Sequence, residues 1–170
     1  MAERVFVDTN VFVYADDDDA GARRDRARAV LAELIPTGRA VISTQVLQEY
    51  FVVAVKKLGL APERARRRVE ALAQLDLVLV QPELILGAID LSRLHDLSFW
   101  DALVVRCAAA AGCARLLTQD LNPGQLIQGV RVENPFAAPP SRARERAPEE
   151  APRGRRMAGR AAPRRSPPRG

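Results

Sequence analysis

Arg4-Val5-Phe6-Val7-Asp8-Thr9-Asn10 is an apolar run that ends in an acid and two small polar residues. Its β-branched and aromatic side chains predict a strand over residues 4–7. Open α/β sheets bind ligands at the carboxyl ends of their strands, so Asp8 is a candidate site residue. Thr9 and Asn10 follow it as polar groups that can hydrogen-bond a carboxylate. The alternative is a helix-cap or turn role for Asp8, which aspartate fills often.

Similar short runs alternate with longer helical patterns along the rest of the chain. Further strands are expected at 40–43, 77–80, 115–118 and 130–133. Helices are expected at 20–35, 44–58, 62–75, 82–94 and 99–111. This alternation predicts an α/β fold with a central, mainly parallel sheet.

The charge of the chain is unevenly distributed. Its 170 residues carry a net charge of +5, but residues 137–170 hold ten Arg and three Glu, a net of +7. Residues 1–136 then hold 16 Lys and Arg against 18 Asp and Glu, a net of −2. Seven of the twelve prolines also lie in 137–170, where large apolar side chains are almost absent. We therefore expect a folded domain over 1–136 and a disordered Arg/Pro-rich extension over 137–170.

The sequence indicates a cytoplasmic protein without membrane contact. No apolar run approaches the roughly 18 residues that a membrane span requires. The first ten residues lack the basic and apolar segments of a signal peptide. Cys107 and Cys113, with one histidine in the chain, do not form a zinc-binding pattern, and we expect two buried thiols.

A second acid follows a strand in the same manner as Asp8. The run Leu116-Leu117-Thr118-Gln119-Asp120 carries an apolar strand into an acid. In a parallel sheet, the carboxyl ends of both strands meet at one edge. Asp120 is therefore expected near Asp8. Two acids at one edge of the sheet are stronger evidence for a site than either acid alone.

Two further acids are expected on helices that approach this edge. Asp101 lies three residues after the expected cap Ser98, where its alternative role is favourable charge at a helix N-terminus. Glu49 has largely apolar neighbours, so it is either a partly buried carboxylate that needs a compensating partner or a surface position on an amphipathic helix.

Four carboxylates around one pocket repel one another unless a cation joins them. Hard oxygen ligands select Mg²⁺ or Mn²⁺ over zinc. Such an ion activates water and neutralises charge on a phosphate. The residues alone therefore favour metal-assisted hydrolysis of a phosphodiester, with the number of ions left open.

Four motifs in this order resemble the PIN-domain family, and most closely its VapC-type toxins. They are Val7-Asp8-Thr9-Asn10, Ser43-Thr44-Gln45-Val46-Leu47-Gln48-Glu49, Leu97-Ser98-Phe99-Trp100-Asp101-Ala102-Leu103 and Leu117-Thr118-Gln119-Asp120-Leu121-Asn122. The resemblance covers residues from about 4 to 135. It implies a three-layer α/β/α fold with a five-stranded, mainly parallel sheet.

The resemblance also implies a function. Asp8, Glu49, Asp101 and Asp120 would bind Mg²⁺ or Mn²⁺ and activate the water that cuts single-stranded RNA. Supporting polar positions match Thr9, Asn10, Thr44 and Asn122, the last standing where some relatives carry another acid. Toxin-type relatives form homodimers and are silenced by an antitoxin protein. The alternatives are a PIN nuclease of RNA processing or DNA repair that has no antitoxin, and a catalytically silent metal-binding or RNA-binding module.

Several other polar features are interpreted as structural. The four acids at 16–19 are expected in a solvated loop or helix start, since consecutive side chains point in different directions. The arginine-rich stretches 23–28 and 64–68 are expected on solvated helix faces, with RNA phosphates as the alternative. Trp100 and Tyr50 are expected to pack rather than to stack on bases. His95 is expected in a loop, without a catalytic role.

Overall fold

The computed structural model describes residues 3–137, which form a mixed α/β fold around one six-stranded sheet. Its strands are β1 (Val5–Val7), β2 (Ala40–Ser43), β3 (Asp76–Val78), β4 (Arg115–Leu117), β5 (Leu126–Ile127) and β6 (Val130–Glu133). Its helices are α1 (Thr9–Asp16), α2 (Ala22–Leu34), α3 (Thr44–Lys56), α4 (Pro62–Leu72), α5 (Pro82–His95) and α6 (Phe99–Ala110). Apart from Ala137, the expected Arg/Pro-rich extension lies outside the described residues.

The strands follow the order β3-β2-β1-β4-β6-β5, and only β5 runs antiparallel to its neighbour. β1 lies inside the sheet with all three of its residues fully buried. Such apolar strands are typical of parallel sheets whose two faces are both covered. Because β1 and β4 are parallel neighbours that pair Val7 with Leu117, the residues that follow them reach the same edge.

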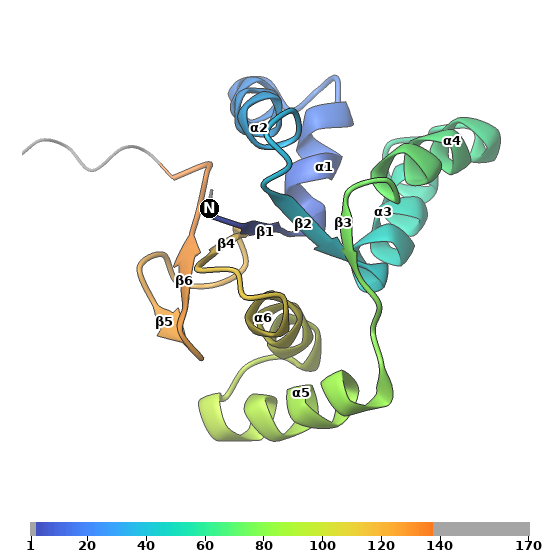
Figure 1. Cartoon of the computed structure of the whole chain (residues 1–170). Coiled ribbons are helices and arrows are strands. Elements are labelled where there is room, and N and C mark those ends of the chain that lie inside the picture. The colour runs from blue at the N-terminus through green and yellow to red at the C-terminus, as the bar shows by residue number, and fades with distance from the viewer. Residues whose placement is uncertain (1–2, 138–170) are drawn as a thin grey trace, which may run out of the picture. The chain divides into compact units, whose positions relative to one another are not determined.

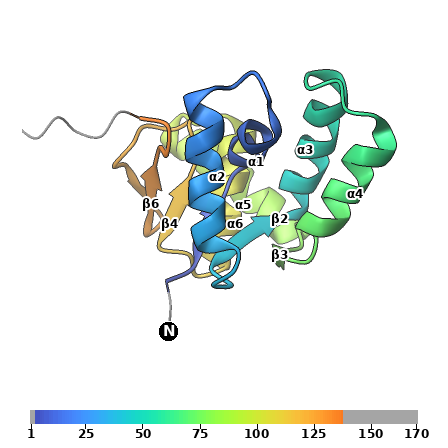
Figure 2. The ribbon, with the colours of Figure 1, turned by 90° about the horizontal axis from the view of Figure 1, so that it is seen from above.

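Helices cover both faces of the sheet, which confirms the expected three-layer arrangement. α1 and α2 lie on one face, and α5 and α6 lie on the other (Figure 1). α3 continues from β2 and forms with α4 a helical pair beside α1 (Figure 2). This pair and α1, together with the N-terminal part of α6, lie around the expected site at the carboxyl edge of the sheet.

The expected number of five strands is wrong by one. β5 has only two residues, and a tight turn through Gln128 and Gly129 joins it to β6. Both turn residues have positive φ, 51° and 80°, as type I′ hairpin turns require. A strand of two residues is too short to show a hydrophobic alternation, so the sequence pattern gave no indication of it.

Helix α1 is a second element that the sequence pattern did not predict. Its sequence, TNVFVYAD, is rich in β-branched and aromatic residues that favour strands. Its buried residues nevertheless recur at helical spacing, three and four positions apart, at Thr9, Val11, Phe12 and Ala15. Burial of this face against the core therefore overrides the local propensity.

The other expected helices and strands are present, with ends that differ by a few residues. Ser98 caps α6, accepting a hydrogen bond from the backbone N–H of Asp101 at 3.1 Å. Cys107 and Cys113 are buried free thiols, as expected. None of the helices over residues 3–137 is both long and apolar enough to cross a membrane.

Candidate active site

Asp8 lies where the chain leaves β1 and enters α1. It is the N-cap of α1, and its Oδ1 accepts a hydrogen bond from the backbone N–H of Thr9 at 2.7 Å. Its Oδ2 accepts from the hydroxyl of Thr118 at 2.7 Å and from the amide of Asn10 at 3.2 Å. Asp8 thus has the helix-cap role, and the cap itself holds the carboxylate at the carboxyl edge of the sheet.

The environment of Asp8 opposes its negative charge. Burial, which leaves the residue 6% exposed, raises the pKa of Asp8 to about 7, because the anion loses its hydration. Hydrogen bonds from Thr118 and Thr9 lower the pKa, whereas the nearby charges of Glu49 and Asp120 raise it. No Lys or Arg over residues 3–137 forms an ion pair with Asp8. A cation bound here would favour the ionised form.

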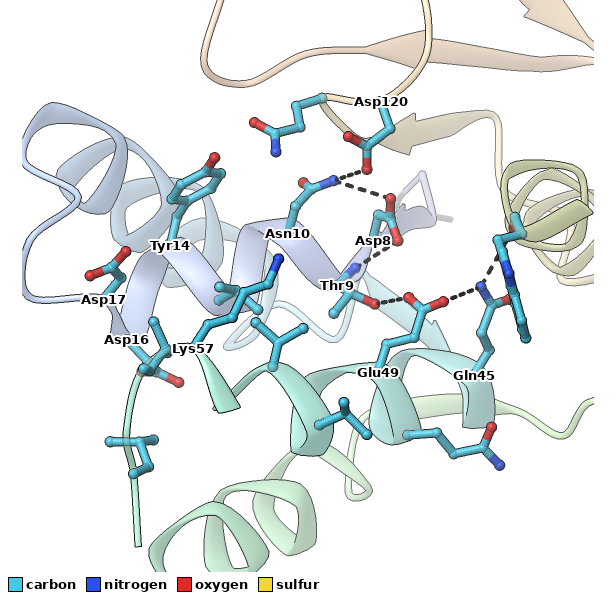
Figure 3. A pocket seen from close by; sticks show the side chains of 18 of the residues that line it. Asp8, Thr9, Asn10, Tyr14, Asp16, Asp17, Gln45, Glu49, Lys57 and Asp120 are labelled. Carbon is cyan, nitrogen blue, oxygen red and sulfur yellow. Dashed lines mark hydrogen bonds between the residues drawn. The ribbon is translucent and has the colours of Figure 1, made fainter. Parts of the chain in front are cut away.

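Thr9 and Asn10 connect Asp8 to two of the other acids (Figure 3). The hydroxyl of Thr9 donates to Glu49 Oε2 at 2.8 Å, while its backbone N–H holds Asp8. The amide of Asn10 contacts both Asp8 and Asp120, the latter at 3.1 Å. The first two residues of α1 therefore join three carboxylates that are far apart in the sequence.

Glu49 is half-buried on α3 and is held from two sides. Besides the Thr9 hydroxyl, it accepts a hydrogen bond at Oε1 from the amide of Gln45 at 2.9 Å. Gln45 lies one turn earlier on the same helix and is 3% exposed. Of the two alternatives left by the sequence, the structure therefore supports the partly buried carboxylate.

Asp120 follows β4 and is exposed, as is typical of a ligand-binding edge. Thr118, two residues earlier, fixes the turn, because its hydroxyl oxygen accepts from the backbone N–H of Asp120 at 3.1 Å. The same hydroxyl donates to Asp8. Thr118 therefore links the ends of β1 and β4.

Asp101 stands apart from this network, in the first turn of α6. Its only side-chain hydrogen bond within residues 3–137 comes from the hydroxyl of Ser98, at 2.6 Å. The two residues form a local cap at the helix N-terminus, where negative charge is favourable. Asp101 nevertheless lines the same pocket as the other three acids.

This acidic pocket has a volume of about 1030 Å³ and lies at the carboxyl edge of the sheet. Its lining includes eight carboxylates, of Asp8, Asp16, Asp17, Asp18, Asp19, Glu49, Asp101 and Asp120. Only two cations, Lys57 and Arg64, line it among the described residues. The pocket therefore carries a strong excess of negative charge.

Two of the predicted supporting residues lie outside this pocket. Thr44 begins α3, and its hydroxyl accepts from the backbone N–H of Val80 at 3.2 Å. Asn122 is exposed beyond the turn that holds Asp120. Neither residue lines the acidic pocket, in contrast to Thr9 and Asn10.

Gln45 and Thr118 hold site carboxylates but are not among the residues predicted from the sequence. Both lie within the four motifs. The spacing of Gln45, four residues before Glu49 on a helix, could have indicated the contact. The role of Thr118 depends on the pairing of β1 with β4, which a sequence pattern does not contain.

The donor set fits a hard divalent cation. The four acids supply oxygen only, with no described His or Cys in the pocket lining, as Mg²⁺ and Mn²⁺ prefer. Two buried acceptors beside them, Asn10 Oδ1 and Gln45 Oε1, have no hydrogen-bond partner among the described residues. As the side chains stand, no three acids over residues 3–137 are close enough to share an ion. Sharing one therefore requires rotation of at least one side chain.

Other polar candidates have structural partners or lie elsewhere. Asp16 is not in a loop or helix start, because it is the last residue of α1 and pairs with Arg68. Tyr50 packs as expected, fully buried. Trp100 differs from the expectation, since it contacts Phe99 edge-on but is 59% exposed beside the acidic pocket. His95 ends α5 rather than lying in a loop, and it does not line this pocket.

Fold and site together define a class: a three-layer α/β protein with an acidic pocket at the carboxyl edge of a parallel sheet. The family model of the PIN domain matches residues 5–125. The chain therefore belongs to the PIN-domain family. No curated protein matches it in sequence.

Solved structures of toxins share this fold at low sequence identity. A toxin–antitoxin complex from Klebsiella pneumoniae matches with a TM-score of 0.59 and 21% identity, over 79% of this chain and 99% of that chain. A DNA-bound VapBC complex from Salmonella typhimurium matches with a TM-score of 0.55 and 22% identity, over 79% of this chain and 99% of that chain. VapC20 of Mycobacterium tuberculosis matches with a TM-score of 0.54 and 22% identity, over 66% of this chain and 86% of that chain. It is described as a Sarcin-Ricin loop cleaving toxin.

Proposed function

We propose that this protein is a metal-dependent endoribonuclease that hydrolyses phosphodiester bonds of single-stranded RNA. The observation that carries the proposal is a buried aspartate, Asp8, in a pocket lined by three further motif acids and without an ion pair to any described Lys or Arg. Uncompensated buried charge is costly, so its retention favours a ligand that supplies positive charge.

Asp8, Glu49, Asp101 and Asp120 would hold Mg²⁺ or Mn²⁺, directly or through water. A bound ion supplies charge neutralisation at the phosphate and lowers the pKa of water at the site. Thr9, Asn10, Gln45 and Thr118 orient Asp8, Glu49 and Asp120 through the hydrogen bonds described above, and Ser98 holds Asp101. Such orientation lowers the reorganisation that the acids need when they bind a cation.

The surroundings of the acids suit a single strand of RNA. The exposed ring of Trp100, at the pocket edge, offers a face on which an unpaired base can stack. Lys57 lines the pocket and points towards the acids, where it can contact a phosphate (Figure 3). The VapC20 structure, similar in fold, is described as that of a Sarcin-Ricin loop cleaving toxin.

We further propose that the chain is the toxin of a toxin–antitoxin pair, acting in the cytoplasm as a homodimer. The solved structures with this fold include toxin–antitoxin complexes, and two VapBC complexes are bound to DNA. The homodimer is supported by exposed apolar side chains on α5, which a second copy of the chain can cover. They are Ile85, Leu86 and Ile89. Light scattering should give the mass of a dimer for the wild type and of a monomer for Leu86→Glu.

The nuclease proposal is tested by mapping the cleavage products of defined single-stranded RNAs. Wild-type protein should cut with Mg²⁺ or Mn²⁺ and stop when EDTA is added. Asp101→Asn should be inactive, and Asp19→Asn, an acid of the same pocket that is not one of the four motif acids, should remain active. Full cleavage in EDTA would rule out the metal mechanism, and full cleavage by Asp101→Asn would rule out a role of Asp101 in it.

The toxin proposal needs a separate test in cells. Induced wild-type protein should arrest bacterial growth, and Asp101→Asn should not. Co-expression of the product of a small adjacent open reading frame should restore growth. RNA cleavage in vitro without growth arrest or an adjacent partner would instead favour a role in RNA processing.

A further inference from the structure

A second pocket, of about 390 Å³, lies between α2 and α4. Five arginines line it: Arg24, Arg28, Arg64, Arg67 and Arg68. Its remaining lining residues are Asp16, Asp18, Tyr50, Leu60 and Ala71. We call it the arginine pocket.

Helical spacing explains how two separate charge runs meet here. On α2, Arg24 and Arg28 are four residues apart, and on α4, Arg64 is followed by Arg67 and Arg68 at three and four residues. Side chains at these spacings share one face of a helix. The sequence indicated two solvated arginine faces, but the fold turns both towards one cavity.

The arginine pocket has more positive charge than its own acids can balance. Five guanidinium groups and the carboxylates of Asp16 and Asp18 leave a net charge of +3. Arg68 pairs with Asp16 at 2.8 Å, and Arg24 pairs with Asp18 at 2.8 Å. The other three arginines therefore make up the excess.

Contacts with the other described residues leave guanidinium nitrogens of these three arginines available for a ligand. Among residues 3–137, Arg28 makes one side-chain hydrogen bond, from Nε to the carbonyl of Ala15 at 2.7 Å. Within the part of the chain that the structure describes, no carboxylate lies within 4.0 Å of Arg28, Arg64 or Arg67 in an ion pair. Like charges gathered around a cavity repel, and an anion inside it removes that repulsion.

The arginine pocket adjoins the acidic pocket. Asp16, Asp18, Leu60 and Arg64 line both. Helix α1 connects them, since it is capped by Asp8 at one end and ends at Asp16. At 1.5 Å per residue, the helix spans about 12 Å. A few linked nucleotides can cover such a distance.

We propose that the arginine pocket binds backbone phosphates of the RNA strand on one side of the bond that is cut. This inference rests on the proposed function, because it takes the substrate to be RNA. Arginine forms paired hydrogen bonds with phosphate oxygens, and phosphate contacts fix the position of a strand without reading its sequence. The continuity with the acidic pocket favours one strand that reaches both over an acidic protein segment.

The test is the double substitution Arg28→Gln with Arg67→Gln in the full-length protein. The matched control is Arg26→Gln with Arg66→Gln, one arginine from each of the same helices. Neither control residue lines the arginine pocket; Arg26 contacts the carbonyl of Pro135, and Arg66 pairs with Glu70. The residues beyond 137 are unchanged in every variant, so differences report the pocket.

Two measurements are needed: RNA cleavage with Mg²⁺, and binding of a fluorescein-labelled single-stranded RNA in EDTA at several salt concentrations. The pocket variant should raise KM about tenfold with kcat unchanged, because charged hydrogen bonds to phosphate are removed. For the pocket variant, the slope of log K for RNA binding against log salt concentration should become shallower by about 0.7 for each phosphate that the protein no longer neutralises. The control should match the wild type, and Arg28→Lys with Arg67→Lys should recover most of the salt dependence.

The outcomes separate this inference from the proposed function. If the wild type cleaves RNA and the pocket variant equals the control in KM and salt dependence, the arginine pocket does not bind RNA. The same holds if the variant loses binding of a labelled poly-glutamate peptide but keeps RNA binding. If RNA binding depends on the arginines but neither the wild type nor any variant cleaves RNA, the arginine pocket binds RNA and the nuclease proposal is wrong. Urea unfolding of each variant checks that the fold is intact.

Discussion

The two ends of α1 carry aspartates in opposite situations. Asp8 caps the first turn, is 6% exposed and has no ion pair within the described residues. Asp16 ends the helix and accepts hydrogen bonds from Arg68 at 2.8 Å and from the hydroxyl of Tyr50 at 2.7 Å. Burial and the bond to Asp16 also raise the pKa of Tyr50 above its ordinary value.

The difference follows from the helix dipole and from the charges around each end. Negative charge is favourable at a helix N-terminus and unfavourable at its C-terminus. Asp16 therefore needs Arg68, and the pairing serves the fold. Asp8 lies at the favourable end of the helix, but two acidic side chains are close to it. A bound cation would compensate its negative charge. The N-terminal end of α1 can therefore bind a cation in the acidic pocket. Its C-terminal end lies beside the arginine pocket, which can bind an anion.

The largest expected effect is on catalysis at the first end of α1. Asp8→Asn should lower kcat for RNA cleavage by about a thousandfold, since a metal ligand worth several kcal/mol is removed. Single-turnover cleavage with saturating Mg²⁺ measures it. Asp19→Asn is the control, and activity of Asp8→Asn near the wild-type level would contradict the role of Asp8.

The next effect is on stability in the absence of metal. The folded-state pKa of Asp8, about 7, exceeds the ordinary 3.8, so its contribution to stability is largest at low pH and is lost as pH rises through 7. Between about pH 5 and about pH 8, the free energy of unfolding of the wild type in EDTA should fall by about 2–3 kcal/mol more than that of Asp8→Asn. Urea unfolding measures both, and parallel pH profiles would refute the raised pKa.

At the other end of α1, the expected loss is in stability rather than chemistry. Asp16→Asn should lower the free energy of unfolding by about 2 kcal/mol, because Arg68 and Tyr50 lose a charged acceptor in a partly buried site. Chemical denaturation measures the change. The single-turnover rate of the folded variant should stay close to that of the wild type; a loss like that of Asp8→Asn would remove the contrast between the ends.

The smallest effect concerns the link between the acids. Thr9→Val keeps the backbone N–H that holds Asp8 but removes the hydroxyl that holds Glu49. Cleavage should fall about tenfold, as expected when one hydrogen bond to a charged group is removed. Thr37→Val, whose hydroxyl contacts the carbonyls of Glu33 and Leu34, is the matched control. Equal rates for both variants would show that Glu49 needs no positioning by Thr9.

Much of the fold was predictable because its elements have strong local patterns. The apolar runs of β1, β2 and β4 are buried strands as expected, and parallel pairing explains why acids after β1 and β4 share an edge. Helix α1 was not predictable, since its β-branched residues favour a strand until the core buries one face. β5 was too short to leave a pattern.

The sequence by itself determined the α/β class and the position of Asp8 at a strand end, because burial and strand propensity are local properties of short runs. It also supplied the four acids in order. Tertiary structure alone decided that Thr9, Asn10 and Thr118 connect these acids, and that Arg68 neutralises Asp16. It also decided that arginines from α2 and α4 share a cavity. Electrostatic interactions depend on distance in space, and the chain brings these charges together only through strand order and helix packing.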